Sequence, residues 1–236
     1  MHIGIIPDGN RRWAKYNDTS LESLPGIWFQ YIIDVLKEYI NNKDLYEKLE
    51  EVTELSIYIC SIDNMNRNDC TYKSILKFID MCIDCYNMSK HTMYEYLMSI
   101  KAIDETLDYD SVYEFLHSLD VKINIVGDKE MIPEKIRNIG TGSKNAKYIV
   151  NLALIYDYAK DLKNFGVEDN DDYNREQSNI DLVIRSGGEQ RISGFFPTKI
   201  LYSELIFIDK LWPDIRLTDI LDSINEYEKR DKRNGL

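Results

Sequence analysis

Cysteine, proline and glycine are scarce in this chain. Its 236 residues include 4 Cys, 5 Pro and 11 Gly, and no linker rich in Gly, Pro or Ser divides the sequence. Cys82 and Cys85 have the spacing of metal ligands, but no second pair matches them and the 3 His are scattered. We therefore expect reduced structural thiols rather than a zinc site.

Positive charge is also in short supply. Lys and Arg number 29 against 41 Asp and Glu, a net charge of −12, which disfavours general nucleic-acid binding because phosphate binding depends on summed positive charge. No apolar run approaches the ~20 residues of a membrane span, and the first apolar run ends at Pro7 without a basic segment before it. We expect no secretory signal, no stable membrane insertion and a cytoplasmic protein.

Strand and helix patterns alternate along the chain, and 44% hydrophobic with 30% charged residues is an ordinary globular mixture. Short β-branched runs predict six strands, at His2–Ile6, Glu54–Cys60, Val121–Val126, Tyr148–Ile155, Ile180–Ile184 and Tyr202–Ile208. Apolar periodicity predicts helices at 11–15, 28–40, two or three within 71–117, one after Pro133, one after the fourth strand, and one at 218–230. Residues 168–179 are acidic and predict a loop. This order predicts a single α/β domain, with a mostly parallel sheet flanked by helices.

Polar residues concentrate in three segments that follow predicted strands. The first, Pro7–Lys15, has the carboxylate of Asp8, a turn at Gly9, and the cations Arg11 and Arg12 early in a helix. This combination suits a phosphate bridged to a carboxylate by Mg²⁺. An ordinary turn followed by a solvated basic helix explains the spacing equally well.

The second segment, 185–193, follows the fifth strand. Arg185 and Arg191 flank a Gly-Gly turn and can converge on one anion, with Ser193 as a further donor and Glu189 to orient a guanidinium. The third segment, 61–67, supplies Ser61, Asn64 and Arg67, and by itself it is a weak signal.

Two anion sites beside a carboxylate indicate phosphate-bearing substrates handled with Mg²⁺. Neither G-x-x-x-x-G-K-[ST] nor G-x-G-x-x-G occurs, which disfavours the common nucleotide-binding folds.

The blocks HIGIIPDGNRRWAK and DLVIRSGGEQRISGFFPTKILYSELIFIDKLWPD resemble the first and last signatures of the cis-prenyltransferases, the undecaprenyl diphosphate synthase family. SIYICSIDNMNR and VKINIVGD also fit, so the resemblance covers most of residues 1–236. It implies a homodimer with a six-stranded, mostly parallel sheet and a hydrophobic tunnel. The implied reaction is Mg²⁺-assisted transfer of an allylic group from its diphosphate to a homoallylic diphosphate.

The resemblance also implies roles for single residues. Asp8 and Glu204 match the acids used at the metal, and Asn10, Ser61 and Asn64 match catalytic positions. The substrate-binding positions, with the last two contributed across the dimer, are Gly9, Arg11, Arg12, Trp13, Arg67, Arg185, Arg191, Ser193, Arg233 and Gly235.

Departures from the family pattern concern the product. Ile27 stands where the family has His, Met65 where it has Trp, and 157–159 replace Gly-Gly-Arg. We expect cis elongation with isopentenyl diphosphate to a short product. The alternatives are head-to-middle coupling of two dimethylallyl diphosphates, as in the lavandulyl-type branch, a non-catalytic partner subunit, and a phospholigand-binding module.

Overall fold

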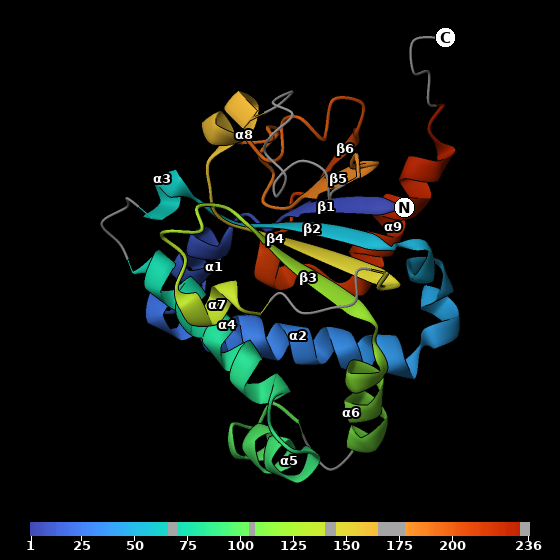
Figure 1. Cartoon of the computed structure of the whole chain (residues 1–236). Coiled ribbons are helices and arrows are strands. Elements are labelled where there is room, and N and C mark those ends of the chain that lie inside the picture. The colour runs from blue at the N-terminus through green and yellow to red at the C-terminus, as the bar shows by residue number, and fades with distance from the viewer. Residues whose placement is uncertain (66–69, 104–106, 140–144, 165–177, 232–236) are drawn as a thin grey trace.

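The sheet contains six strands, all parallel, in the order β3-β4-β2-β1-β5-β6 (Figure 1). The computed structural model describes residues 1–65, 70–103, 107–139, 145–164 and 178–231. The strands are β1 His2–Ile6, β2 Glu54–Ser61, β3 Val121–Val126, β4 Tyr148–Tyr156, β5 Leu182–Arg185 and β6 Glu204–Phe207. The predicted six-stranded parallel sheet is confirmed, and β5 and β6 are shorter than the sequence pattern indicated.

Helices occupy most of the segments between strands. The α-helices are α1 Asn10–Tyr16, α2 Leu24–Asn41, α3 Ile62–Met65, α4 Thr71–Tyr86, α5 Lys90–Ser99, α6 Tyr109–Ser118, α7 Glu134–Arg137, α8 Tyr158–Asn164 and α9 Leu217–Lys229. Three short 3₁₀ helices are η1 Leu21–Ser23, η2 Lys43–Glu51 and η3 Trp212–Asp214. The described residues of the helical span before β3 thus form three helices, within the predicted two or three. No helix among the described residues is both long and apolar enough to cross a membrane.

The two faces of the sheet are covered differently. The long helix α2 runs under one face with α4 beside it, and α8 lies over the other face (Figure 1). Under β1, β5 and β6, Ile3, Ile5 and Ile184 pack with Ile224 of α9. On the opposite face, Phe195 and other aromatic side chains fill the space above the central strands.

Strand β1 lies at the centre of the sheet, between β2 and β5. The chain leaves β1 toward β2 on one side and later returns to β5 on the other, so the strand order reverses at β1. In parallel sheets, ligands bind beyond the carboxyl ends of the strands at such a switch point. The segments that follow β1, β2 and β5 are the three that the sequence analysis singled out.

Buried thiols belong to the hydrophobic interior. The four cysteines form no disulfide, and Cys60 and Cys85 are buried. Burial raises the pKa of Cys60 to about 11 and the pKa of Cys82 to about 12. These thiols therefore stay protonated at neutral pH and act as apolar packing groups.

Candidate active site

Asp8 joins the carboxyl ends of β1 and β5. One oxygen of its carboxylate accepts the Gly9 N–H at 2.6 Å, and the other accepts from Arg185 Nη2 at 2.7 Å. Its backbone carbonyl accepts from Ser186 Oγ at 2.8 Å and from the Trp212 N–H at 2.9 Å. The side chain keeps about a third of its surface exposed, so a metal or ligand can reach the carboxylate.

Glycine is required at two turns around Asp8. Gly9 has φ +101°, and a Cβ there would lie 2.7 Å from Leu211 Cδ2. Gly187 has φ +89°, and a Cβ there would lie 2.8 Å from Arg12 Nη2. Both values fall in the region that L-residues rarely adopt, so these turns bring two backbone segments and a guanidinium closer than other residues allow.

Arg185 is the buried cation of the site, with only 4% of its surface exposed. Besides Asp8, its Nη1 donates to Ser193 Oγ at 2.9 Å and to the carbonyl of Arg191. Its Nε is buried and has no hydrogen-bond partner in the described part of the chain. A buried guanidinium N–H without an acceptor is costly, and a bound anion or water at this edge would reduce that cost.

Two further arginines lie over the same carboxyl-terminal end of the strands as Arg185. Arg12 Nη2 is 3.8 Å from Asp8 Oδ1, and Arg12 Nη1 is 3.8 Å from Glu189 Oε1. Arg191 pairs with the other oxygen of Glu189, so this carboxylate orients both guanidiniums. Arg12 and Arg191 are 41% and 62% exposed, which leaves their remaining N–H groups available to an anionic substrate.

Asn10 connects the site to the hydrophobic interior. Its Nδ2 donates to the carbonyl of Pro7 at 2.8 Å, and its Oδ1 accepts from Trp28 Nε1 of α2 at 2.8 Å. Helix α1 has only seven residues and no acidic residue in its first turn. The arginines, more than the dipole of so short a helix, therefore supply the positive charge here.

Ser61 and Asn64 form a closed turn at the end of β2. Ser61 Oγ and N–H both donate to Asn64 Oδ1, at 2.7 and 3.0 Å, and the Asn64 N–H donates back to Ser61 Oγ at 3.2 Å. On the same strand, Tyr58 donates its hydroxyl to the carbonyl of Ser193 at 3.1 Å. Burial raises the pKa of Tyr58 to about 12, so it remains a donor and ties β2 to the 185–193 segment.

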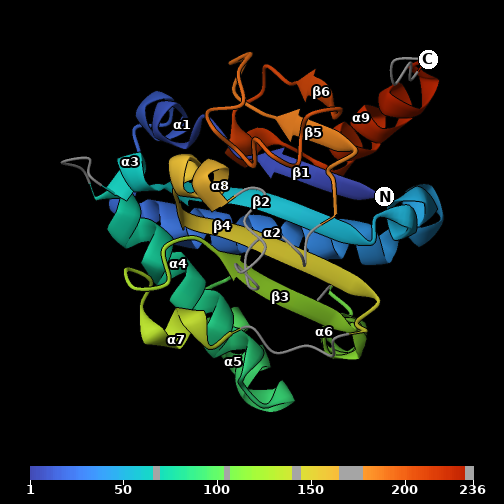
Figure 2. The ribbon, with the colours of Figure 1, turned by 45° about the horizontal axis from the view of Figure 1, so that its top comes forward.

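Glu204 lies at the amino-terminal end of the strands, opposite to the end that carries Asp8. It begins β6 in register with Leu182 of β5, which pairs with Ile3 of β1. Asp8 follows Ile3 by five residues, about 16 Å along the strand direction at ~3.3 Å per residue. Glu204 pairs there with Arg230, the residue that follows α9, at 2.7 Å. In the ribbon, β6 lies beside α9 and away from α1 (Figure 2). The structure therefore places these two acids at opposite ends of the strands within one chain, and the role of each at a metal stays a prediction.

The donor set at Asp8 restricts how a metal could bind. Among the described residues, no three His, Cys, Asp or Glu side chains gather closely enough to hold an ion. A lone carboxylate beside an anion site is nevertheless a common arrangement for Mg²⁺, which takes its other ligands from water and substrate phosphates. Asp8 with the flanking arginines fits that mode.

The remaining predicted residues differ in position. Arg11 is exposed on α1, and Trp13 donates its Nε1 to Asp214 at 2.8 Å, which links α1 to η3. Arg67, Arg233 and Gly235 lie outside the described residues.

Sequence reasoning missed three contributors to the site. It did not assign Ser186, which holds the Asp8 carbonyl, Tyr58 or Trp28. Ser186 follows Arg185 directly in the sequence, so its place next to a predicted substrate-binding arginine could have identified it. The other two contacts join distant segments and left no local pattern.

Similar proteins of known family identify the family of this chain. The prenyltransferase family model described as undecaprenyl diphosphate synthase matches residues 6–235. A tritrans,polycis-undecaprenyl-diphosphate synthase (geranylgeranyl-diphosphate specific) from Sulfurisphaera tokodaii is 31% identical, over 99% of this chain and 87% of the relative. A similar synthase (GGDP specific) from Sulfolobus acidocaldarius is 29% identical, with the same coverage.

A solved structure shares the fold. Lavandulyl diphosphate synthase from Lavandula x intermedia, in complex with dimethylallyl diphosphate, superposes with a TM-score of 0.59 at 22% identity. The match covers 98% of this chain and 96% of the other. On the family match and these relatives, this chain belongs to the undecaprenyl diphosphate synthase family of prenyltransferases, as its sequence blocks indicated.

Proposed function

We propose that this prenyltransferase joins an allylic diphosphate to isopentenyl diphosphate by Mg²⁺-dependent cis elongation. The observation that carries the proposal is the Asp8–Arg185 pair at the switch point, flanked by Arg12 and Arg191. One carboxylate with three arginines suits two diphosphates better than it suits a single neutral ligand.

The proposed chemistry makes one C–C bond. The allylic C–O bond breaks with both electrons leaving on the diphosphate, and the double bond of isopentenyl diphosphate attacks the allylic carbon. This attack leaves a carbocation on the acceptor, which passes a proton to the released diphosphate and so restores a double bond. Bound Mg²⁺ would neutralise charge on the leaving diphosphate.

The chain itself would orient both reactants. Asp8 would hold the metal, and Arg12 would contact the leaving diphosphate. Arg185, Arg191 and Ser193 would bind the diphosphate of the acceptor. Preorganised cations of this kind stabilise developing charge without reorganisation in the transition state. Ser61 and Asn64 would position the acceptor beside the carboxylate.

The assembly state is proposed from the resemblance, and the location from the free thiols, which are typical of reducing compartments. We propose a homodimer, in which Arg233 and Gly235 of one chain serve the acceptor site of the other. We further propose that the enzyme acts in the cytoplasm.

The test is a turnover assay on the purified protein. Labelled isopentenyl diphosphate is supplied with dimethylallyl, geranyl, farnesyl or geranylgeranyl diphosphate, and products are identified by mass spectrometry. We expect elongation that stops with EDTA and returns with added Mg²⁺. Product from dimethylallyl diphosphate alone would instead establish head-to-middle coupling. Binding of both diphosphates without any turnover would identify a partner subunit or a binding module.

A further inference from the structure

The carboxyl-terminal part of β2 departs from regular pairing with β4. Tyr58 pairs with Ala153. Two residues further along β2, Cys60 pairs with Leu154, which is the very next residue of β4. Strand β2 therefore carries one extra residue at this point, Ile59, which makes a β-bulge.

A second bulge lies on β4 and restores the register. Ser61 follows Cys60 directly, yet it pairs with Tyr156, two residues beyond the partner of Cys60. The extra residue on β4 is Ile155. Each of the two strands thus has one bulge just before Ser61, at the end of the sheet that carries Asp8.

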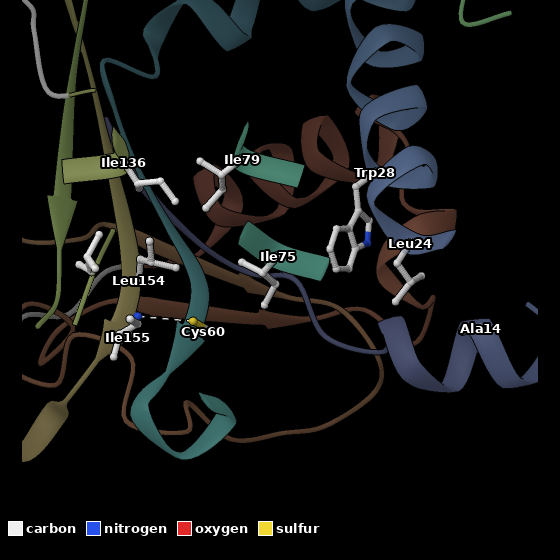
Figure 3. Close-up of a cluster of buried hydrophobic side chains, with 10 residues drawn as sticks. Ala14, Leu24, Trp28, Cys60, Ile75, Ile79, Ile136, Leu154 and Ile155 are labelled. Atoms are coloured by element: carbon white, nitrogen blue, oxygen red, sulfur yellow. Dashed lines mark hydrogen bonds between the residues drawn. The ribbon is translucent and has the colours of Figure 1, made fainter. Parts of the chain in front are cut away.

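Because of these bulges, successive side chains meet the same face of the sheet. Regular alternation would place them on opposite faces. Ile59 and Cys60 are successive, yet both pack in the apolar cluster between the sheet and helices α2 and α4 (Figure 3). Ser61 pairs with Tyr156, which packs in the cluster around Phe195 on the other face. Ser61 therefore lies on the Phe195 face of the sheet.

Without the bulge on β2, Ser61 would face the helices instead. It follows Tyr58 by three residues, and side chains three apart in a regular strand point to opposite faces. Tyr58 lies on the Phe195 face, where its hydroxyl donates to the carbonyl of Ser193 at 3.1 Å. Burial raises the pKa of Tyr58 to about 12, and a hydrogen bond with Ser61 opposes that rise, so the two side chains lie together. The bulge thus brings Ser61 beside the segment proposed to bind the acceptor.

The extra residue on β4 is held in an unfavourable backbone conformation. Ile155 is fully buried and has φ +52°, a left-handed conformation that is rare for a β-branched residue. Such conformations persist where the surrounding contacts fix them. The carbonyl of Ile155 accepts from the Asp128 N–H at 3.2 Å, and its own N–H donates to Cys60 Sγ at 3.4 Å (Figure 3).

The sulfur of Cys60 replaces the strand partner that the Ile155 N–H lacks. The extra residue of a bulge is left out of the ladder, and a buried N–H without an acceptor is costly. Cys60 is itself turned toward this face by the bulge on β2. The two bulges therefore support each other, because the first directs the thiol and the thiol satisfies the second.

We propose that Cys60 is a positioning residue, whose sulfur fixes the two bulges and thereby keeps Ser61 on the face of the proposed acceptor site. This inference rests on the proposed function, in which Ser61 positions isopentenyl diphosphate. Loss of the sulfur acceptor favours regular pairing of β2 with β4, which would turn Ser61 toward α2 and α4.

The first experiment is a double-mutant cycle. Cys60→Ala removes the acceptor of the Ile155 N–H, so kcat/KM for isopentenyl diphosphate should fall ~10- to 100-fold, as expected for a displaced positioning group. Ser61→Ala should cause a similar loss, and Cys60→Ala added to Ser61→Ala should lower kcat/KM no further. Additive losses would overturn the proposal, because Cys60 would then not act through Ser61.

Three further variants separate the hydrogen bond from packing. Cys60→Ser supplies a hydroxyl acceptor and should keep kcat/KM within about threefold of wild type, whereas Cys60→Val fills the space without an acceptor and should behave like Cys60→Ala. Cys85→Ala is the matched control, because this buried thiol of α4 packs in a different cluster; it should leave kcat/KM unchanged. Circular dichroism checks the fold of each variant. Equal kcat/KM in folded Cys60→Ser and Cys60→Val would overturn the role of the sulfur.

Calorimetry with isopentenyl diphosphate alone distinguishes failure of this inference from failure of the proposed function. No C–C bond forms without an allylic partner, so affinity is measured without turnover. Cys60→Ala and Cys60→Val should bind about tenfold more weakly than wild type and Cys60→Ser, as for the loss of one hydrogen bond to a charged group. If the wild type turned over no allylic diphosphate, this pattern would contradict the proposed function and support the role of Cys60. Equal affinities in that case would overturn both.

Discussion

At the residue scale, the candidate site is a set of charges that hold one another in place. Arg185 is buried and bonds to Asp8, Ser193 and the carbonyl of Arg191, whereas Arg12 and Arg191 remain half to mostly exposed. The buried cation therefore fixes the geometry of the site and has, in the described part of the chain, only its Nε nitrogen left for an anion, whereas the exposed ones can contact substrate through several N–H groups. These two roles predict different effects of substitution.

Substitution of Asp8 should separate catalysis from stability. Asp8→Asn keeps the size of the side chain and one acceptor oxygen, which can serve Gly9 or Arg185 but not both, and it loses the charge. We therefore expect kcat to fall by ~10³-fold or more with the fold intact. Asp8→Ala also leaves Arg185 without its partner and should lower the free energy of unfolding by a further ~1–3 kcal/mol. Steady-state kinetics and urea denaturation test this; kcat near wild type in folded Asp8→Asn would contradict it.

Arg191 should act mainly on the acceptor. Because it is 62% exposed, Arg191→Ala should fold normally and raise the KM for isopentenyl diphosphate by ~10-fold or more, from ~1.5–3 kcal/mol of lost charge-assisted binding. The KM for the allylic substrate should change less. Arg137→Ala, an exposed arginine on α7, is the control. Equal losses for both substrates would show that the two anion sites are assigned wrongly.

At the element scale, tight turns and a buried polar network position the sheet. At the amino-terminal end of the strands, His2 Nε2 is 2.8 Å from Ser56 Oγ and its Nδ1 is 2.9 Å from Ser178 Oγ. Asn151 donates to Glu54 and to Ser56 at 2.8 and 3.0 Å. These bonds join β1, β2 and β4 at the end opposite to the candidate active site.

The turn at Gly187 should tolerate no side chain. In Gly187→Ala the methyl group would press on Arg12 in a backbone conformation with φ +89°, so we expect a loss of ~1–3 kcal/mol in stability and weaker activity. Gly26→Ala is the contrast, because nothing lies within 4 Å of a Cβ there and the residue is helical. It should stabilise the protein by ~0.5–1 kcal/mol. Thermal and urea unfolding measure both, and equal effects would refute the argument.

The polar network should make stability depend on pH. Burial lowers the pKa of His2, opposed by the carboxylates of Glu54 and Asp181. The folded state thus favours neutral His2, and its contribution is fully present above the unfolded-state pKa near ~6.5 and lost as pH falls below that value.

This pH effect is measured by urea denaturation at pH 7.5 and 5.5. The free energy of unfolding should fall more in the wild type than in His2→Asn, which has no imidazole to protonate. A parallel fall in both proteins would assign the acid sensitivity to other groups.

At the scale of the whole molecule, the proposed dimer predicts complementation between chains. A chain shortened after Asp231 keeps the Arg230–Glu204 pair but lacks Arg233 and Gly235. Mixed with Asp8→Ala chains, it should regain activity, because one heterodimeric site combines an intact Asp8 with an intact tail. Light scattering would verify assembly. Failure to recover activity in verified heterodimers would exclude a role for the tail across the dimer.

Much of the fold was predictable because the local pattern and the final structure agree. Val121–Val126 is a strand in both, since a β-branched run ends at a glycine turn. The three polar segments each follow a predicted strand, and the carboxyl ends of parallel strands lie at the same end of a sheet, where ligands bind. That reasoning depends only on periodicity and chain order, which the sequence determines by itself.

The tertiary structure alone decided the strand order and the distant contacts. The register of β6 places Glu204 at the amino-terminal end of the strands, beside Arg230, whereas Asp8 follows the carboxyl end of β1. The contact of Trp28 with Asn10 likewise depends on how α2 docks under the sheet. Such pairings arise from packing between segments far apart in the chain, and the period of hydrophobic residues within each segment carries no record of them.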